Sequence, residues 1–321
     1  MAEGSSLKSL RDRVGLVVAG ADSQAVVERI VAAEAAGVPR VWMTQGAAAP
    51  DTLSIFAAAA VRTTTIGLGT AIVPTYPRHP ITLAQQALTI ADLAPGRLRL
   101  GVGPSHRPII EGVYGLSLDA PMAHLREYVA ILRDLLHDGK SEYQGEFHRV
   151  RATLPRPSGT PILISALRAG AFQLSGEISD GALSWLCPPA YLLNISLPAL
   201  QSGAALAGRP APPLVAHVPV ALSTDRAAVA VAARKLLGGY ARLPFYAGMF
   251  ADAGFPPAPD GSVPDALIDG LVVSGDEAAI ENRLHELLDQ SLDELLIMPV
   301  PIADETDERE RLARLVGRLA G

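Results

Sequence analysis

The chain alternates short apolar runs with amphipathic stretches along almost its whole length. Continuously apolar runs favour strands that are buried on both faces, and such strands separated by helices are typical of a covered parallel sheet. The pattern therefore predicts an α/β protein with eight strands. The expected strands are residues 14–19, 41–43, 66–73, 98–102, 161–165, 182–186, 214–222 and 294–298.

The helix expected between the fourth and fifth strands has the clearest amphipathic pattern. Asp119 and Pro121 suit a helix start, since proline is tolerated in the first helical turn. Apolar residues then recur at helical spacing and define the face that should pack against the core. These residues are Met122, Leu125, Val129, Leu132 and Leu136.

Eight strand–helix units in 321 residues fit one closed (β/α)8 barrel (a TIM barrel), expected as a single domain over residues 1–321. The rival is an open doubly wound sheet. That fold normally carries a glycine-rich phosphate motif after its first strand, where this chain has Ala19, Gly20, Ala21 and Asp22. Two segments do not fit the repeated strand–helix unit and are expected to be insertions. One is a β-hairpin at about 138–158, before the fifth strand, and the other is a helical insertion at about 238–270, after the seventh.

Composition excludes several classes of protein. With 49% hydrophobic and 19% charged residues the chain is too apolar for a disordered protein, and a net charge of −6 argues against a nucleic-acid partner. A single cysteine, Cys187, excludes a disulfide framework. The seven histidines never fall at a spacing that would place a metal site on one element, so no metal is expected.

Membrane association is not expected either. The run 181–208 is uncharged and long enough to span a bilayer, but Pro188 and Pro189 interrupt it. A buried strand, a loop and a helix explain the run better. Residues 1–13 mix charges without the apolar stretch of a signal peptide, so a soluble, cytoplasmic protein is predicted.

The chain lacks a P-loop, a Gly-x-Ser-x-Gly elbow and a His-Glu-x-x-His motif. Instead, glycines recur at the carboxyl ends of the third and fourth strands, in Gly67-Leu68-Gly69 and Gly101-Val102-Gly103. Such glycines either let the backbone approach a planar ligand at the barrel mouth or only relieve crowding where loops begin.

Several segments of this region resemble the luciferase-like monooxygenase superfamily. They are Pro-Thr-Tyr-Pro-Arg-His-Pro at 74–80, Ala-Gln-Gln-Ala at 84–87, and Gly-Arg-Leu at 96–98 followed by Gly-Val-Gly at 101–103. Ser-His-Arg-Pro at 105–108, with Glu111 and Gly112, resembles the branch that uses the deazaflavin coenzyme F420. Further similar segments are Tyr143 and Gly145, Ser-Asp-Gly at 179–181 and Leu-Pro-Phe-Tyr at 243–246.

The resemblance implies a barrel, often dimeric, that holds its cofactor at the carboxyl ends of the strands. In such proteins the third strand ends in a bulge, often with a non-prolyl cis peptide, that supports the flavin-like ring; the matching positions are Thr70, Ala71 and Ile72. The cofactor slot is then expected to include Gln45, Gly69, Thr70, Ala71, Ile72, Gly103, Pro104, Ser105 and Trp185. Trp185 could equally be a core residue.

Two segments depart from the family pattern. Many relatives have an acidic residue and a histidine after the second strand, whereas this chain has Thr44, Gln45 and Gly46. Relatives commonly hold the cofactor phosphate on a Gly-Pro loop after the fifth strand. Here the loop is Ala166, Leu167, Arg168, Ala169 and Gly170. The Arg168 guanidinium group could bind the phosphate in place of backbone N–H donors, or Arg168 could be an ordinary solvated loop residue.

The leading hypothesis is an oxidoreductase that transfers a hydride between F420 and a small organic substrate, since the cofactor supplies the redox chemistry and no catalytic triad is needed. The alternatives are an FMN-dependent monooxygenase and a redox-inactive ligand-binding barrel. His106 follows the fourth strand and is the candidate acid or base, because an ordinary histidine titrates near ~6.5; it could instead only bind the ring. The resemblance and the low charge content suggest a homodimer.

Overall fold

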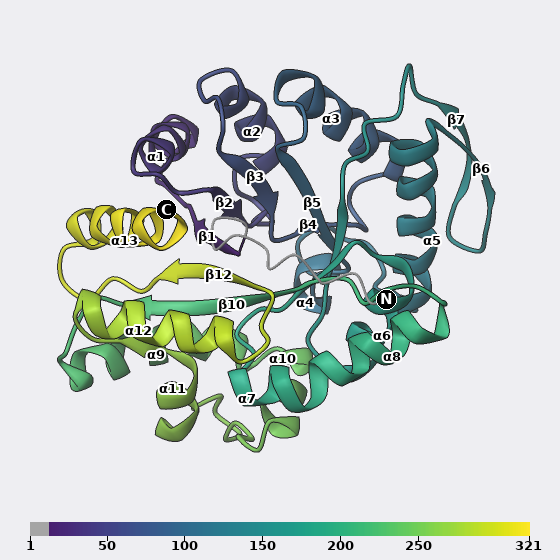
Figure 1. Ribbon diagram of the computed structural model, residues 1–321. Coiled ribbons are helices and arrows are strands. Elements are labelled where there is room, and N and C mark those ends of the chain that lie inside the picture. Colours follow the sequence, from purple (N-terminus) through teal and green to yellow (C-terminus); the bar gives the residue numbers. More distant parts are fainter. Residues whose placement is uncertain (1–12) are drawn as a thin grey trace, which may run out of the picture.

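The eight apolar runs form parallel strands that pair side by side and close into a ring, because β9 pairs with β10. In the computed structural model, which describes residues 13–321, helices surround this ring (Figure 1). The predicted (β/α)8 barrel is therefore confirmed, and the closed ring excludes the doubly wound sheet. The strands are β1 (Val14–Val17), β2 (Arg40–Met43), β3 (Gly67–Thr70), β5 (Leu98–Gly103), β8 (Ile162–Ser165), β9 (Gly181–Leu183), β10 (Leu214–Ala221) and β12 (Glu294–Pro299).

Five of the eight helices that follow the strands begin at a side chain that accepts a hydrogen bond from a free N–H group of the first turn. Asp22 caps α1 in this way, and Gly37, with φ +85°, follows its end. His79 caps α3 by accepting from the N–H group of Ile81 at 3.2 Å. These helices are α1 (Ser23–Ala35), α2 (Thr52–Ala60), α3 (Pro80–Leu93), α5 (Pro121–Arg133), α6 (Ala169–Ile178), α8 (Leu197–Leu206), α12 (Glu277–Asp289) and α13 (Glu305–Ala320).

Both predicted insertions are present. The hairpin consists of β6 (Lys140–Gln144) and β7 (Arg149–Thr153) and lies beside α5 (Figure 1). Glu127 of α5 holds its turn by accepting three backbone N–H groups, those of Glu146, Phe147 and His148, at 2.7–3.0 Å. After β10 come α9 (Arg226–Tyr240), α10 (Pro244–Asp252), α11 (Asp265–Leu271) and β11 (Val273–Ser274).

Shorter elements connect these parts. The uncharged run 181–208 folds as strand β9, a loop and helices, as expected from its prolines. Among residues 13–321, no helix has both the length and the apolar character needed to cross a membrane. The segment 1–12, on which part of the signal-peptide argument rests, lies outside the described residues. The remaining elements are α4 (Arg107–Ile110), the π-helix Asp134–Asp138, α7 (Pro189–Tyr191) and the π-helix Leu192–Ser196.

The third strand differs from its prediction. Residues 66–73 were expected as one strand, but β3 ends at Thr70, the Ala71–Ile72 peptide bond is cis, and β4 (Val73–Pro74) pairs again with β5. At this point the Thr70 hydroxyl links β3 to β5. It accepts a hydrogen bond from the N–H of Gly101 and donates one to the carbonyl of Gly101, each at 2.8 Å. The cis peptide that the family resemblance implied is thus present, and it interrupts the strand.

The barrel interior is packed around the indole ring of Trp42, which is fully buried. A Cβ atom at Gly69 would lie 2.3 Å from this ring, and one at Gly15 would lie 2.6 Å from its nitrogen. At the N-terminal end of the barrel, Arg99 lies 5.3 Å from the ring centre and is paired with the buried carboxylate of Glu294. The N-terminal half of the barrel is therefore filled by side chains.

Adding one methyl group at Gly69 should destabilise the protein, because the Trp42 ring cannot move within a full barrel. We expect Gly69→Ala to lower the free energy of unfolding by about 1–3 kcal/mol, the usual cost of overpacking. Urea denaturation measures the change. Gly238→Ala on α9 is the matched control: its Cβ meets open space, so it should be neutral or slightly stabilising. Equal effects of both substitutions would contradict the packing argument.

Candidate functional site

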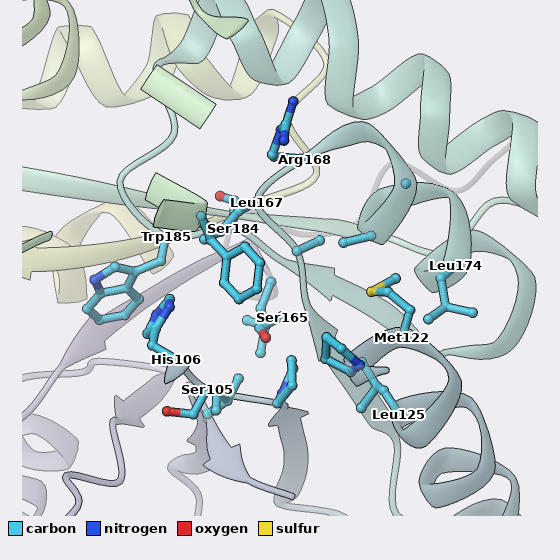
Figure 2. A pocket seen from close by; sticks show the side chains of 18 of the residues that line it. Ser105, His106, Met122, Leu125, Ser165, Leu167, Arg168, Leu174, Ser184 and Trp185 are labelled. Atoms are coloured by element: carbon cyan, nitrogen blue, oxygen red, sulfur yellow. The ribbon is translucent and has the colours of Figure 1, made fainter. Parts of the chain in front are cut away.

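A cavity of about 1130 Å³ opens at the carboxyl ends of the strands, where barrel enzymes place their active sites (Figure 2). Most of the residues predicted for a cofactor slot line it. The loop after β8 and the start of α6 border one side, and the loop after β5 borders another. The predicted residues that line the cavity are Gln45, Ala71, Ile72, Pro104, Ser105, His106, Ala166, Leu167, Arg168, Ala169, Gly170 and Trp185.

Three predicted slot residues do not line the cavity, because each one is used inside the barrel. Gly69 leaves room for the Trp42 ring, and the Thr70 side chain is bonded to the backbone of β5. A Cβ atom at Gly103 would lie 2.0 Å from the hydroxyl oxygen of Ser165. Gly103 therefore makes space for Ser165, and it is Ser165 that faces the cavity (Figure 2).

His106 forms part of an aromatic wall with residues from the late insertion. Its ring centre lies 5.9 Å from that of Phe245 and 5.2 Å from that of Tyr246, both on α10. The preceding residue, Ser105, adopts a left-handed backbone with φ +62°, which non-glycine residues rarely take and which is found at functional loops.

Burial lowers the pKa of His106 below its ordinary value. The imidazole is therefore neutral at pH 7, so it can accept a proton but carries no charge to attract an anion.

Trp185 follows β9 and serves both of the roles considered for it. It lines the cavity on one side, and on the other it stacks on His217 of β10, with ring centres 3.8 Å apart. The Nδ1 atom of His217 accepts the N–H of Leu186 at 3.2 Å, and its Nε2 atom lies 3.4 Å from the sulfur of Met298. Burial lowers the pKa of His217 to about 3, so a neutral ring supports Trp185.

Arg168 precedes the first turn of α6, at the cavity edge. Its guanidinium group holds the carboxylate of Asp252, the last residue of α10, through two hydrogen bonds of 2.7 and 3.2 Å. In Figure 2 the side chain points away from Ser165 and His106. Nothing in the sequence indicated that Asp252, 84 residues further along the chain, would form an ion pair with Arg168.

The side-chain amide of Gln45 also forms hydrogen bonds within its own loop. Its amide oxygen accepts the N–H of Thr52 at 2.8 Å, and its amide nitrogen donates to the carbonyl of Gly46 at 2.9 Å. Its backbone N–H reaches the carbonyl of Ile72 at 3.2 Å, beside the cis peptide. Gln45 therefore shapes the floor of the cavity, and its own loop uses one N–H group and one lone pair of its amide.

Several lining residues were not predicted as part of a site. Met122 and Leu125 were assigned to a helix face that packs on the core, yet both border the cavity, and Met122 is 38% exposed. Tyr240, Phe245 and Tyr246 also line the cavity; they belong to the insertion predicted at about 238–270, whose place in the fold the sequence did not indicate. Within residues 13–321, no group of three histidine, cysteine or acidic side chains is arranged to hold a metal ion.

Comparison with known proteins identifies similar chains. A family model described as luciferase-like monooxygenase matches residues 8–294. An F420-dependent glucose-6-phosphate dehydrogenase from Mycobacterium avium is 31% identical over 218 residues, which are 62% of this chain and 65% of that protein. The chain thus matches less than two-thirds of the length of such curated relatives.

Solved structures share the fold at low sequence identity. An F420-dependent secondary alcohol dehydrogenase, solved with an F420–acetone adduct, superposes with a TM-score of 0.80 at 17% identity and covers 96% of this chain and 99% of its own. The oxygenating constituent of 3,6-diketocamphane monooxygenase from Pseudomonas putida, solved with FMN, has a TM-score of 0.71 at 16% identity and covers 96% and 98%. At these identities the likeness shows the fold alone.

The buried His217 should make the protein sensitive to acid. Its pKa is about 3 when folded and near ~6.5 when unfolded, so the unfolded chain binds the proton first, and stability falls as the pH drops from about 6.5 toward 3. We expect His217→Gln to reduce this loss by up to about 1.4 kcal/mol per pH unit between pH 6 and 4. Chemical denaturation at several pH values measures the slope.

The control for this experiment is His285→Gln, on α12 and outside the cavity. It should keep the wild-type slope. A slope unchanged by His217→Gln would show that His217 does not couple folding to pH.

Proposed function

Because the chain belongs to the luciferase-like monooxygenase family, we propose that it is an oxidoreductase that binds F420 at the barrel mouth and transfers a hydride between this cofactor and a small organic substrate. One observation carries the proposal. The segment 105–108, which resembles the F420-dependent branch, and the segment 243–246, a further match to the superfamily, come from distant parts of the chain. They meet in one cavity wall through His106, Phe245 and Tyr246.

The cavity suits a planar ring with a phosphate-bearing tail. Ala71 and Ile72 provide an apolar floor, and the rigid indole of Trp185 provides a flat wall supported from behind by His217. The Ser165 hydroxyl faces this space and would hydrogen-bond a polar edge of the ring (Figure 2). Pockets for cofactors combine such apolar walls with few polar groups.

The first turn of α6 suits the phosphate. Backbone N–H groups at a helix start have no partner within the helix and carry partial positive charge. The space above Gly170 is open, since a Cβ atom there would meet nothing within 4 Å. Arg168 is already paired with Asp252, so the N–H groups of residues 169 and 170 would hold the phosphate, and Arg168 would add only a partly neutralised charge.

F420, when bound, would supply the hydride chemistry. The protein's own side chains would orient the ring, exclude water from its face and handle one proton. His106 is the candidate for that proton: its imidazole is held neutral by burial and is packed against Phe245 and Tyr246 beside the substrate space. As a neutral imidazole it would accept the proton of an alcohol, and in the reverse direction the imidazolium, protonated from solvent, would give a proton to the reduced substrate.

FMN binding is the alternative, because the same slot and helix start suit a flavin phosphate, and the FMN-bound diketocamphane enzyme shares the fold. The homodimer and the cytoplasmic location inferred from the sequence stay predictions.

Cofactor titration tests the proposed function and its phosphate site together. F420 should bind the purified protein in the micromolar range with a change in fluorescence, and FMN should not. Gly170→Asp should weaken F420 binding by about 1.5–3 kcal/mol, the range for hydrogen bonds to charged groups, because it places a carboxylate where the phosphate would lie. Gly170→Ala is the matched control and should bind normally. Binding of FMN alone would favour the monooxygenase, and binding of neither cofactor would favour a redox-inactive barrel.

Replacing His106 separates proton transfer from ring binding. If His106 handles the proton, His106→Ala should reduce turnover by ~10²–10⁴-fold and leave the dissociation constant of F420 close to that of the wild type. A weaker cofactor affinity with intact turnover at saturation would instead assign His106 to ring binding. His285→Ala serves as the control for losing a histidine elsewhere.

A further inference from the structure

We propose that the substrate is an uncharged, largely apolar molecule, and that internal ion pairs at the cavity wall exclude phosphorylated substrates. This inference rests on the proposed function and concerns the part of the cavity that the cofactor ring would leave free. It follows from the charges and the apolar side chains of the wall.

Each arginine that lines the cavity is paired with a carboxylate of the same wall. Arg168 holds Asp252 through two hydrogen bonds, and Arg126 of α5 contacts Glu177 of α6 at 2.5 Å. No lysine is among the described residues that line the cavity. Neither arginine therefore offers an unpaired positive charge to an incoming anion.

A third carboxylate, that of Glu127, also borders the cavity and is held by the backbone of the hairpin turn. Two positive side chains thus face three negative ones. An incoming phosphate would have to displace a carboxylate that is tethered beside its arginine and therefore present at high effective concentration. It would then lie next to the displaced carboxylate, and like charges at close range repel.

The cofactor phosphate would avoid this competition, because the N–H groups at the start of α6 are independent of the ion pairs. Once it occupied them, it would repel a second anion in the same cavity. The remaining surface would suit only an uncharged group.

The rest of the wall is apolar. Met122, Leu125 and Leu174 gather on one side of Ser165, opposite Trp185 and His106 (Figure 2). At the rim, Met122 and Phe245 are each 38% exposed. Exposed apolar groups around a pocket mark a surface for apolar ligands.

The test compares two ligands that share one apolar body, 2-naphthol and 2-naphthyl phosphate. Their binding is measured by calorimetry to the F420-loaded chain and, without cofactor, to Gly170→Asp, in which a carboxylate blocks the phosphate site at the start of α6. Both proteins should bind 2-naphthol at least tenfold more tightly than its phosphate. Asp252→Asn, which frees Arg168, should raise the affinity for the phosphate at least tenfold and leave that for 2-naphthol unchanged. Asp252 is partly exposed, so this substitution should not prevent folding.

The double variant Arg168→Ala with Asp252→Asn is the control, and it should lose the gained affinity for the phosphate. Equal binding of both ligands by the wild type, or no gain in Asp252→Asn, would overturn the inference. Failure of F420 to bind would contradict the proposed function only, because the naphthol comparison is also made without cofactor.

Discussion

Close packing around one indole ring is the constraint on which the rest of the structure depends. Trp42 fills the barrel interior, and the strands can close around it only because Gly15 and Gly69 present no side chain there. The Arg99–Glu294 pair closes the N-terminal end. Because side chains fill the N-terminal half of the barrel, the cavity of about 1130 Å³ lies at the carboxyl ends of the strands, where the loops can shape it.

The loops that border the cavity form hydrogen bonds and ion pairs among their own polar groups. The amide of Gln45 bonds its own loop, Arg168 bonds Asp252, and Glu127 bonds the hairpin backbone. Buried or half-buried polar groups are costly unless they are paired, so a rigid wall of this kind is stabilised from within. The consequence for function is a cavity whose polar residues are mostly occupied and whose accessible surface is apolar and aromatic.

Much of the fold could be predicted because it depends on local patterns. Apolar runs located all eight strands, Pro121 located the start of α5, and both insertions lie where they were expected. The third strand was the exception, since no local pattern predicts that a strand stops at Thr70 and resumes at Val73. The resemblance to a family, not periodicity, indicated that break.

The sequence by itself determined that the chain forms a covered parallel barrel and which loops border its mouth, because periodicity and turn residues act over a few neighbouring positions. Only the tertiary structure decided which side chains in those loops are free. Gly103 leaves space for the Ser165 side chain, and Met122 lies at the cavity rim instead of in the core. Asp252 forms an ion pair with Arg168. Such outcomes depend on contacts between residues far apart in the chain, whose distances are set only when the ring of strands closes.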